Sequence, residues 1–254
     1  MNITFCAFFA GAVIVSGMVC VQAEETTEGR DSAARVVLLH GLGRSSRSMN
    51  KMAAYLEDQG YDTVNIDYPS TRLSIEDIVN RHITPEINAL KSQGQGPIHF
   101  VTHSLGGILL RQYLQTETLP QGSRAVLLAP PNHGSELADA LKPFALYKWS
   151  MGPAGQQLGT DASSIPTQLK PITMEIGVIT GDRDGFPVFS HLFSGKNDGK
   201  VSVESAKLEE MKAFKVVHCG HTFIMTRKDV LKDVAHFLST GGFIQDTPPS
   251  VPDK

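Results

Sequence analysis

Three side chains at separate places in the chain could together carry out nucleophilic acyl transfer. Ser104 lies in the run FVTHSLGG, after a short apolar stretch and directly before two glycines. Asp198 lies in KNDGKV and His221 in HCGHTF, so the chain order is serine, acid, histidine. A serine hydroxyl becomes an effective nucleophile when an imidazole takes its proton and a carboxylate orients that imidazole. These three residues therefore predict a Ser-His-Asp arrangement.

The surroundings of Ser104 predict a sharp turn from a strand into a helix. The pattern strand, x-x-Ser-x-Gly, helix is the form of a nucleophile elbow, which lifts the hydroxyl above the sheet at the positive end of the helix. Small residues are needed two positions before and after the serine, because the strand and helix backbones nearly touch there. Gly106 and Gly107 meet the second demand, and Thr102 meets the first only loosely. The alternative is a Ser-Gly-Gly loop that merely ends a strand.

The segment LHGLG, after the first predicted strand, has the composition expected of an oxyanion hole. Gly41 and Gly43 allow the backbone to approach a reacting group closely. We expect the backbone N–H groups of Leu42 and Leu105 to converge on the developing negative oxygen. His40 is predicted to order this loop by hydrogen bonding rather than to act as the base.

Both the base and the acid have rivals. His218 lies closer to the last predicted strand than His221 does, and it is predicted to be packed or structural. Asp182 and Asp184 directly follow a predicted strand, which is also a place where an acid could lie. They flank an arginine and are interpreted as a charged turn whose members pair locally. Asp198 is favoured because it heads Asp-Gly-Lys-Val, a tight turn, and lies nearer in sequence to the predicted base.

Short apolar runs alternate with helical patterns and would position these residues. Such alternation predicts an α/β fold with a parallel sheet covered by helices on both faces. Ligands of such sheets bind beyond the carboxyl ends of the strands, where Ser104 is expected. The predicted strands are residues 35–39, 63–67, 98–102, 125–129, 176–180 and 214–217, and the predicted helices are 48–59, 74–90 with a kink at Pro85, and 229–238.

Composition is that of an ordinary globular protein and argues against several function classes. The 254 residues are 41% hydrophobic and 19% charged, which allows one sizeable core. The formal net charge of −3 and the absence of a basic block argue against nucleic acid as a partner. No Cys or His pattern has zinc-ligand spacing and no loop has calcium-ligand spacing, so we expect no metal and no other cofactor.

The two ends of the chain are predicted to lie outside the folded domain, which is expected over residues 24–240. Residues 1–23 carry no charged side chain and end in Val-Gln-Ala, the pattern of a cleaved signal peptide, so the protein is predicted to be periplasmic or secreted. An uncleaved membrane anchor is the alternative, since the uncharged run is long enough to span a bilayer. Residues 241–254 are predicted to be a flexible tail.

Taken together, the segments VVLLHGLG, FVTHSLGG, LAPPNHGSELAD, NDGKVSVESAK and GHTFIM resemble an α/β-hydrolase of the compact bacterial lipase/esterase kind. They occur in the family's order and cover most of residues 35–237. The resemblance implies the α/β-hydrolase fold with a mostly parallel six-stranded sheet. It also implies Ser104, Asp198 and His221 as the catalytic triad, and hydrolysis of carboxylic esters of acyl or lipid type.

Two departures leave the subfamily open. Thr102 stands where the family's best-known pattern has glycine, and no strand pair is predicted before Arg35, which suggests a minimal sheet. A thioesterase, amidase or acyltransferase on the same scaffold is an alternative. A non-catalytic interaction module is another, although an inactive relative usually lacks a triad member.

Residues 136–171 form a long insertion between two predicted strands. It contains four large apolar or aromatic side chains: Phe144, Tyr147, Trp149 and Met151. One interpretation is a small lid or acyl-binding wall above the nucleophile, and the other is that these side chains simply pack the insertion onto the domain. Trp149, together with His103 beside the nucleophile, is a candidate substrate-binding residue. Transient contact with a membrane or lipid surface is compatible with this pattern.

Overall fold

The computed structural model describes residues 34–184, 187–193 and 195–245. The predicted signal peptide at residues 1–23, and residues 246–254 of the predicted tail, lie outside the described residues. Among the helices of the described part, none combines the length and the apolar character needed to cross a bilayer.

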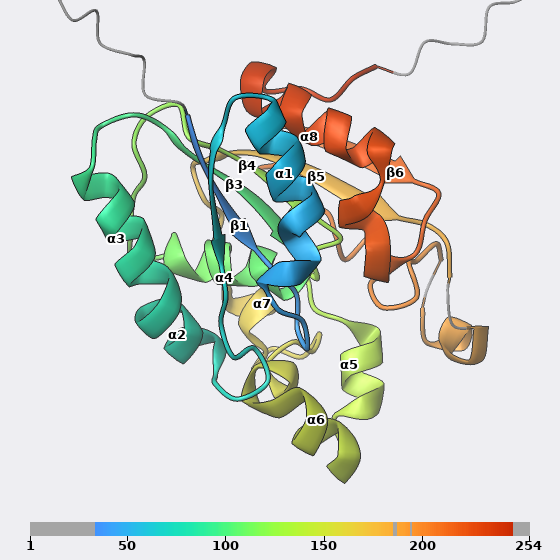
Figure 1. The fold of residues 1–254 in the computed structure, drawn as a ribbon. Coiled ribbons are helices and arrows are strands. Elements are labelled where there is room, and N and C mark those ends of the chain that lie inside the picture. Colours follow the sequence, from blue (N-terminus) through green and yellow to red (C-terminus); the bar gives the residue numbers. More distant parts are fainter. Residues whose placement is uncertain (1–33, 185–186, 194, 246–254) are drawn as a thin grey trace, which may run out of the picture. The chain divides into compact units, whose positions relative to one another are not determined.

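Six parallel strands form the centre of the domain, as predicted (Figure 1). The strands are β1 (Arg35–Leu39), β2 (Asp62–Ile66), β3 (Ile98–His103), β4 (Arg124–Leu128), β5 (Glu175–Gly181) and β6 (Ala213–Val217). Their order across the sheet is β2-β1-β3-β4-β5-β6, and every neighbouring pair is parallel. The strand order therefore reverses beside β1, and such a switch point is where ligands bind in open α/β sheets.

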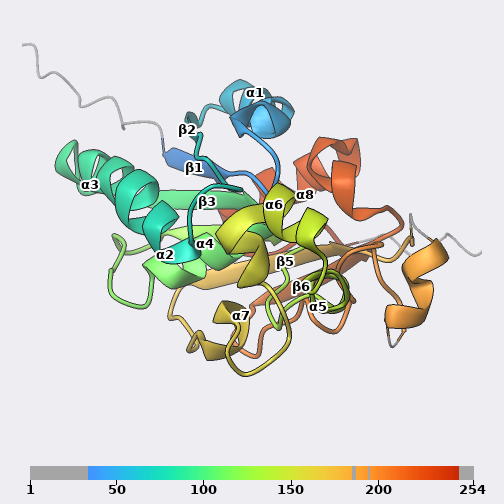
Figure 2. The same cartoon turned by 90° about the horizontal axis from the view of Figure 1, so that it is seen from below.

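Helices cover both faces of the sheet (Figures 1 and 2). On one face lie α1 (Asn50–Asp58) and α8 (Lys228–Thr240), and on the other lie α2 (Ile75–Ile78), α3 (Thr84–Ser92) and α4 (Leu105–Tyr113). The two layers follow from strand geometry, since successive side chains point to opposite faces. Val36 and Leu38 of β1 pack with the first group of helices, whereas Val37 and Leu39 pack with the second.

The helical segment predicted over residues 74–90 is interrupted in the structure. Ser74 caps α2, and its Oγ accepts a hydrogen bond from the backbone N–H of Asp77 at 3.1 Å. A π-helical turn at Val79–Ile83 then precedes α3, which has Pro85 in its first turn. Because proline has no N–H to donate, it is tolerated in a first turn but breaks a helix interior. The hydrogen-bonding pattern therefore changes in the turn just before Pro85, where a kink is predicted.

The C-terminal boundary of the domain lies later than predicted. Gly241 ends α8 in the left-handed conformation, with φ at +81°. Phe243 is buried, and its ring centroid lies 5.1 Å from that of Phe237. Residues 241–245, predicted as the start of a flexible tail, thus pack against α8, because an aromatic side chain just after the helix returns to the core.

His99 on β3 makes stability depend on pH. The side chain is buried, and its Nδ1 accepts a hydrogen bond from the backbone N–H of Arg124 at 3.0 Å. Burial first, and the charge of Arg124 second, lower the pKa of His99 from 6.5 to about 4. Between these two values the unfolded chain binds a proton that the folded chain does not. Stability present above pH 6.5 is therefore lost as the pH falls towards 4.

The replacement His99→Asn tests this dependence, because the amide oxygen can accept the same hydrogen bond without titrating. From the lowered pKa of His99, we expect the free energy of unfolding of the native protein to fall by about 2 to 3 kcal/mol between pH 7.5 and pH 4.5. Urea unfolding at both pH values should show a decrease that is smaller by about 2 kcal/mol in His99→Asn. His133 is exposed, and His133→Asn serves as the control. An identical decrease in His99→Asn and the native protein would contradict the prediction.

Candidate active site

Ser104 lies between β3 and α4 with a strained backbone. Its φ of +53° is in a region that residues with a side chain rarely adopt. Gly106 lets α4 follow at once, because a Cβ there would stand 2.5 Å from the carbonyl oxygen of Leu39 in β1. Thr102 is buried, and a Cβ on Gly107 would stand 3.4 Å from its Oγ1. The structure thus contains the predicted strand-to-helix turn and tolerates the threonine.

A continuous chain of hydrogen bonds joins Ser104, His221 and Asp198. The Ser104 Oγ lies 2.9 Å from His221 Nε2, and Asp198 Oδ2 lies 2.8 Å from His221 Nδ1. Because a carboxylate only accepts, Nδ1 carries the proton and Nε2 accepts from the serine hydroxyl. Within the described residues, no group of three or more His, Cys, Asp or Glu side chains could hold a metal ion. The arrangement is suited to nucleophilic attack by the serine oxygen.

The loop that carries Asp198 fixes its carboxylate in place. Oδ1 accepts hydrogen bonds from the backbone N–H groups of Lys200 at 3.0 Å and Val201 at 2.9 Å. The Asp198 carbonyl also accepts from the backbone N–H of His221 at 2.9 Å. Gly199 takes a φ of +92°, which this tight turn requires. The carboxylate therefore cannot rotate away from the imidazole without losing two hydrogen bonds.

Asp182, the rival acid, is paired with other side chains. Its carboxylate lies 2.9 Å from His218 Nδ1 and 3.2 Å from Lys196 Nζ. His218 was predicted to be packed or structural; it is not packed, since 80% of its side chain is exposed. The predicted local pairing of Asp182 within its own turn is replaced by pairing between loops. Loops that follow neighbouring strands meet at the same edge of the sheet, which the local sequence does not reveal.

The two predicted oxyanion donors, the backbone N–H groups of Leu42 and Leu105, lie beside the nucleophile. Neither the Leu42 nor the Leu105 backbone N–H has a hydrogen-bond partner among the described residues. Leu105 is the first residue of α4, where an N–H has no intrahelical acceptor. Leu42 follows Gly41, which approaches the elbow so closely that a Cβ on it would stand 3.2 Å from the Cβ of Ser104. Both N–H groups are thus available to an oxygen in the site.

Two more histidines, His40 and His103, lie next to the residues of the site, and both have a lowered pKa. The ring of His40 stacks on Tyr68 with centroids 3.9 Å apart, and its Nδ1 donates to the carbonyl of Gly41 at 2.9 Å. Burial lowers the pKa of His40, and it orders the loop as predicted. The Nε2 of His103 donates to the carbonyl of His221 at 3.0 Å. Burial first, and the nearby His221 second, hold the pKa of His103 well below its usual range.

A cavity of about 220 Å³ opens beside Ser104. The insertion between β4 and β5 contains α5 (Glu136–Leu141), α6 (Ala145–Gln156) and α7 (Ile165–Gln168). Figure 1 shows α5 and α6 beyond the carboxyl ends of the strands, at the lower end of the view. Apolar or aromatic side chains from this insertion line the cavity: Leu137, Ala138, Leu141, Tyr147, Met151 and Leu158. His103, a predicted substrate-binding residue, also borders the cavity.

Trp149, the other predicted substrate-binding residue, does not line the cavity. Its side chain lies on the surface, 83% exposed. Tyr147 and Met151 stand two residues before and two after it on α6, and a helix turns by about 100° per residue. The tryptophan therefore points away from the face that these two residues share. The prediction that Trp149 binds substrate is therefore replaced by Tyr147 and Met151, which line the cavity. Their i, i+4 spacing places them on one face of the helix, and this spacing is visible in the sequence.

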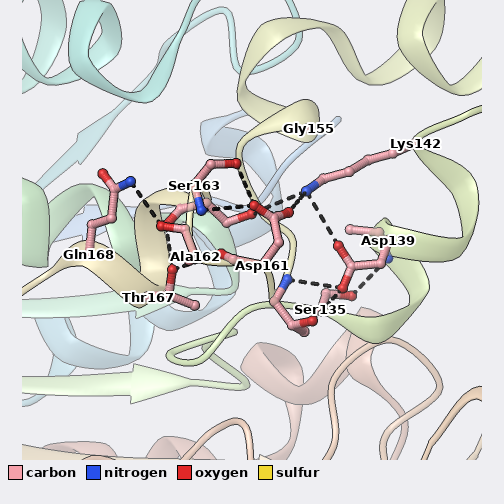
Figure 3. Close-up of polar contacts among 12 residues, drawn as sticks. Ser135, Asp139, Lys142, Gly155, Asp161, Ala162, Ser163, Thr167 and Gln168 are labelled. Carbon is pink, nitrogen blue, oxygen red and sulfur yellow. Dashed lines mark hydrogen bonds and ion pairs between the residues drawn. The ribbon is translucent and has the colours of Figure 1, made fainter.

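Polar side chains hold the segments of the insertion together (Figure 3). Lys142, which follows α5, lies 3.3 Å from Asp139 and 2.9 Å from Asp161. Asp161 also accepts hydrogen bonds from the Ser163 backbone N–H at 2.9 Å and from the Ser164 hydroxyl at 2.9 Å. The hydrogen bonds from Ser163, Lys142 and Ser164 lower the pKa of Asp161. The network thus links α5 to the segment before α7, on either side of the helix that carries part of the cavity wall.

Residues 36–233 match the family model described as the alpha/beta hydrolase family. The chain belongs to this family. No curated protein matches the chain. The similarity of this α/β-hydrolase to solved structures confirms its fold.

Three of these structures show the range of the similarity. The mature lipase BlEst2 of Bacillus licheniformis has a TM-score of 0.66 and 22% identity, over 77% of this chain and 88% of that one. This chain covers 53% of the propeptide form of the same lipase. The metagenomic carboxyl esterase MGS0156 has a TM-score of 0.57 and 17% identity, and the match covers 75% of this chain and 65% of the esterase. The Paleococcus ferrophilus monoacylglycerol lipase has a TM-score of 0.52 and 19% identity, and the match covers 80% of this chain and 93% of the lipase.

Proposed function

We propose that this α/β-hydrolase cleaves carboxylic esters through an acyl-enzyme formed on Ser104. The observation that carries the proposal is the hydrogen-bonded chain from Ser104 Oγ through the imidazole of His221 to Asp198, with links of 2.9 and 2.8 Å. Membership of the alpha/beta hydrolase family supports it. The similarity in fold to proteins named lipase, carboxyl esterase and monoacylglycerol lipase is further support.

The proposed reaction has two steps. In the first, His221 Nε2 takes the proton of Ser104 as the serine oxygen attacks the ester carbonyl. Asp198 stabilises the resulting imidazolium, and the Leu42 and Leu105 N–H groups bind the oxyanion, each contributing roughly 3 kcal/mol to transition-state stabilisation. His221 then gives its proton to the leaving alcohol. In the second step, a water molecule gives a proton to His221 and its oxygen attacks the acyl carbon. The bond between this carbon and Ser104 Oγ then breaks, His221 returns the proton to Oγ, and the carboxylic acid leaves.

The size of the cavity favours a short acyl chain. Its volume of about 220 Å³ lies below the roughly 300–1,000 Å³ of common small-molecule pockets. Its wall against α5 and α6 is apolar, which suits the hydrocarbon part of an ester. We therefore place the acyl group against the insertion, with Met151 among the side chains that limit its length.

The variant Met151→Ala tests this placement. Removing the side chain enlarges the acyl cavity, so kcat/KM for an octanoate ester should rise several-fold relative to butyrate, since each additional buried methylene contributes about 0.8 kcal/mol. Steady-state kinetics on p-nitrophenyl esters of two to twelve carbons measures the profile. Trp149→Ala, on the exposed face of α6, should change KM for short and long esters equally. An unaltered profile in Met151→Ala would place the acyl group elsewhere.

The same ester series tests the proposed activity itself. The purified protein should release p-nitrophenol with saturation kinetics and a preference for short acyl chains. The matching S-acyl thioesters, and an added alcohol as acyl acceptor, separate ester hydrolysis from thioester hydrolysis and acyl transfer. Absence of turnover with every ester would overturn the proposal.

A further inference from the structure

Two basic side chains, Arg44 and Lys200, line the cavity beside Ser104, and none of the described residues that line it is acidic. Both are partly buried. Among the described residues, neither forms an ion pair with a carboxylate. The nearby Asp198 is already engaged by His221 and by two backbone N–H groups. Within the described part of the chain, the cavity therefore holds two basic side chains, neither of which is paired with a carboxylate.

Lys200 is kept at the cavity by its backbone. Its N–H donates to Asp198 Oδ1 at 3.0 Å, and its carbonyl accepts from the Ser135 hydroxyl at 2.7 Å. Burial first, and the charge of Arg44 second, lower the pKa of Lys200, while Asp198 opposes the shift. A cation that is partly desolvated next to another cation is unfavourable by itself. An anion that enters the cavity removes this penalty.

Arg44 lies on the histidine side of the cavity. Its Nη2 donates to the carbonyl of Thr222 at 3.3 Å, and its guanidinium lies 5.8 Å from the ring centroid of Phe223. Thr222 directly follows His221, and Lys200 belongs to the loop that carries the acid. Because the imidazole gives its proton to the leaving alcohol, the alcohol half of a substrate must lie on this side. The acyl half then faces the apolar wall of α5 and α6.

We infer that Arg44 and Lys200 bind an anionic group, a phosphate or a carboxylate, on the alcohol half of the ester. The preferred substrate is then a short-chain acyl ester of an anionic alcohol, an inference that rests on the proposed function. Guanidinium and ammonium groups both donate charge-assisted hydrogen bonds to such oxygens. Attack, proton transfer and deacylation proceed as for a neutral ester, and the anion leaves with the alcohol.

Two matched pairs of esters test the inference. One compares butyrylglycerol 3-phosphate with monobutyrylglycerol, and the other compares 4-butyryloxybenzoate with its methyl ester. The native enzyme should have the higher kcat/KM for the anionic member of at least one pair. Lys200→Gln and Arg44→Gln should each lower the anionic-to-neutral ratio about tenfold, and the double variant about a hundredfold. Lys196→Gln and Arg47→Gln remove the same formal charge from exposed positions and should keep the native ratio.

Binding to the inactive Ser104→Ala protein makes the test independent of turnover. Calorimetric titration with butyrylglycerol 3-phosphate and with 4-butyryloxybenzoate should give, for the better ligand, a Kd that rises about tenfold when Lys200→Gln or Arg44→Gln is added. If neutral esters are hydrolysed but the anionic-to-neutral ratio of kcat/KM is near one, the anion site is overturned and the proposed function stands. The same conclusion follows if this ratio is unchanged in the double variant. No hydrolysis of any ester, with a Kd that still depends on these two cations, would overturn the proposed function and support the anion site. A Kd independent of both cations, for both ligands, would overturn the anion site.

Discussion

Replacing Ser104 with alanine is expected to abolish ester hydrolysis and labelling by a fluorophosphonate probe, while the protein folds as before. The change removes the only atom that is proposed to form the acyl bond, so kcat should fall roughly 10⁶-fold, as for triad knockouts in a serine protease. Alanine retains the Cβ, and the strained φ of +53° is therefore no worse than in the native protein. Initial rates, probe labelling and the thermal unfolding midpoint measure the three parts of this expectation.

A matched control distinguishes loss of the nucleophile from a general effect of a serine replacement. Ser92 is exposed at the end of α3, and Ser92→Ala should keep full labelling and turnover. Labelling that survives in Ser104→Ala would assign the nucleophile to another residue.

Asp198→Asn is expected to have the second largest effect, a fall in kcat of roughly 10⁴-fold with little change in the unfolding midpoint. The amide oxygen can still accept from the Lys200 and Val201 N–H groups, so the loop keeps its shape. The amide nitrogen then faces His221 Nδ1 as a hydrogen-bond donor. Nδ1 must therefore be the unprotonated nitrogen of the ring, so that it can accept this hydrogen bond. Nε2 in that tautomer carries a proton and cannot accept the one from Ser104.

The corresponding change in the rival acid provides the control. Asp182 pairs with His218 and Lys196 rather than with His221, so Asp182→Asn should keep most of the activity. Steady-state kinetics and thermal unfolding on the two variants side by side decide between the loops. Loss of activity in Asp182→Asn with activity retained in Asp198→Asn would move the acid to the loop after β5.

The elements that depend on local signals could be predicted from the sequence. Most strands of the sheet are short runs of apolar and β-branched residues, and each strand begins within one residue of its predicted start. The strand-to-helix turn at Ser104 follows from a serine that ends an apolar run ahead of Gly106 and Gly107, since few other residues allow the backbones to come so close. The hydrogen bonds of the acid loop also follow from Asp-Gly-Lys-Val, a sequence that can close a tight turn.

Features that depend on contacts between distant segments could not be predicted in this way. The pairing of Asp182 with His218 joins residues from the loops after β5 and β6. The juxtaposition of Arg44 and Lys200 requires the loop after β1 and the acid loop to meet at one cavity. The sequence shows that the insertion contains both Trp149 and Met151, but not which of them lines the cavity. Which face of α6 is turned inward depends on where the helix packs.

The central claim is that an acyl-enzyme forms on Ser104. It is tested most directly by measuring the mass of the protein during turnover of an ester. Rapid mixing with p-nitrophenyl butyrate, acid quenching and peptide mass spectrometry measure whether an acyl group is attached and where. The account predicts a burst of p-nitrophenol that approaches one equivalent per chain, and a butyryl group on the peptide that contains Ser104. Steady hydrolysis with no acylated protein, or a butyryl group on another residue that persists in Ser104→Ala, would contradict it.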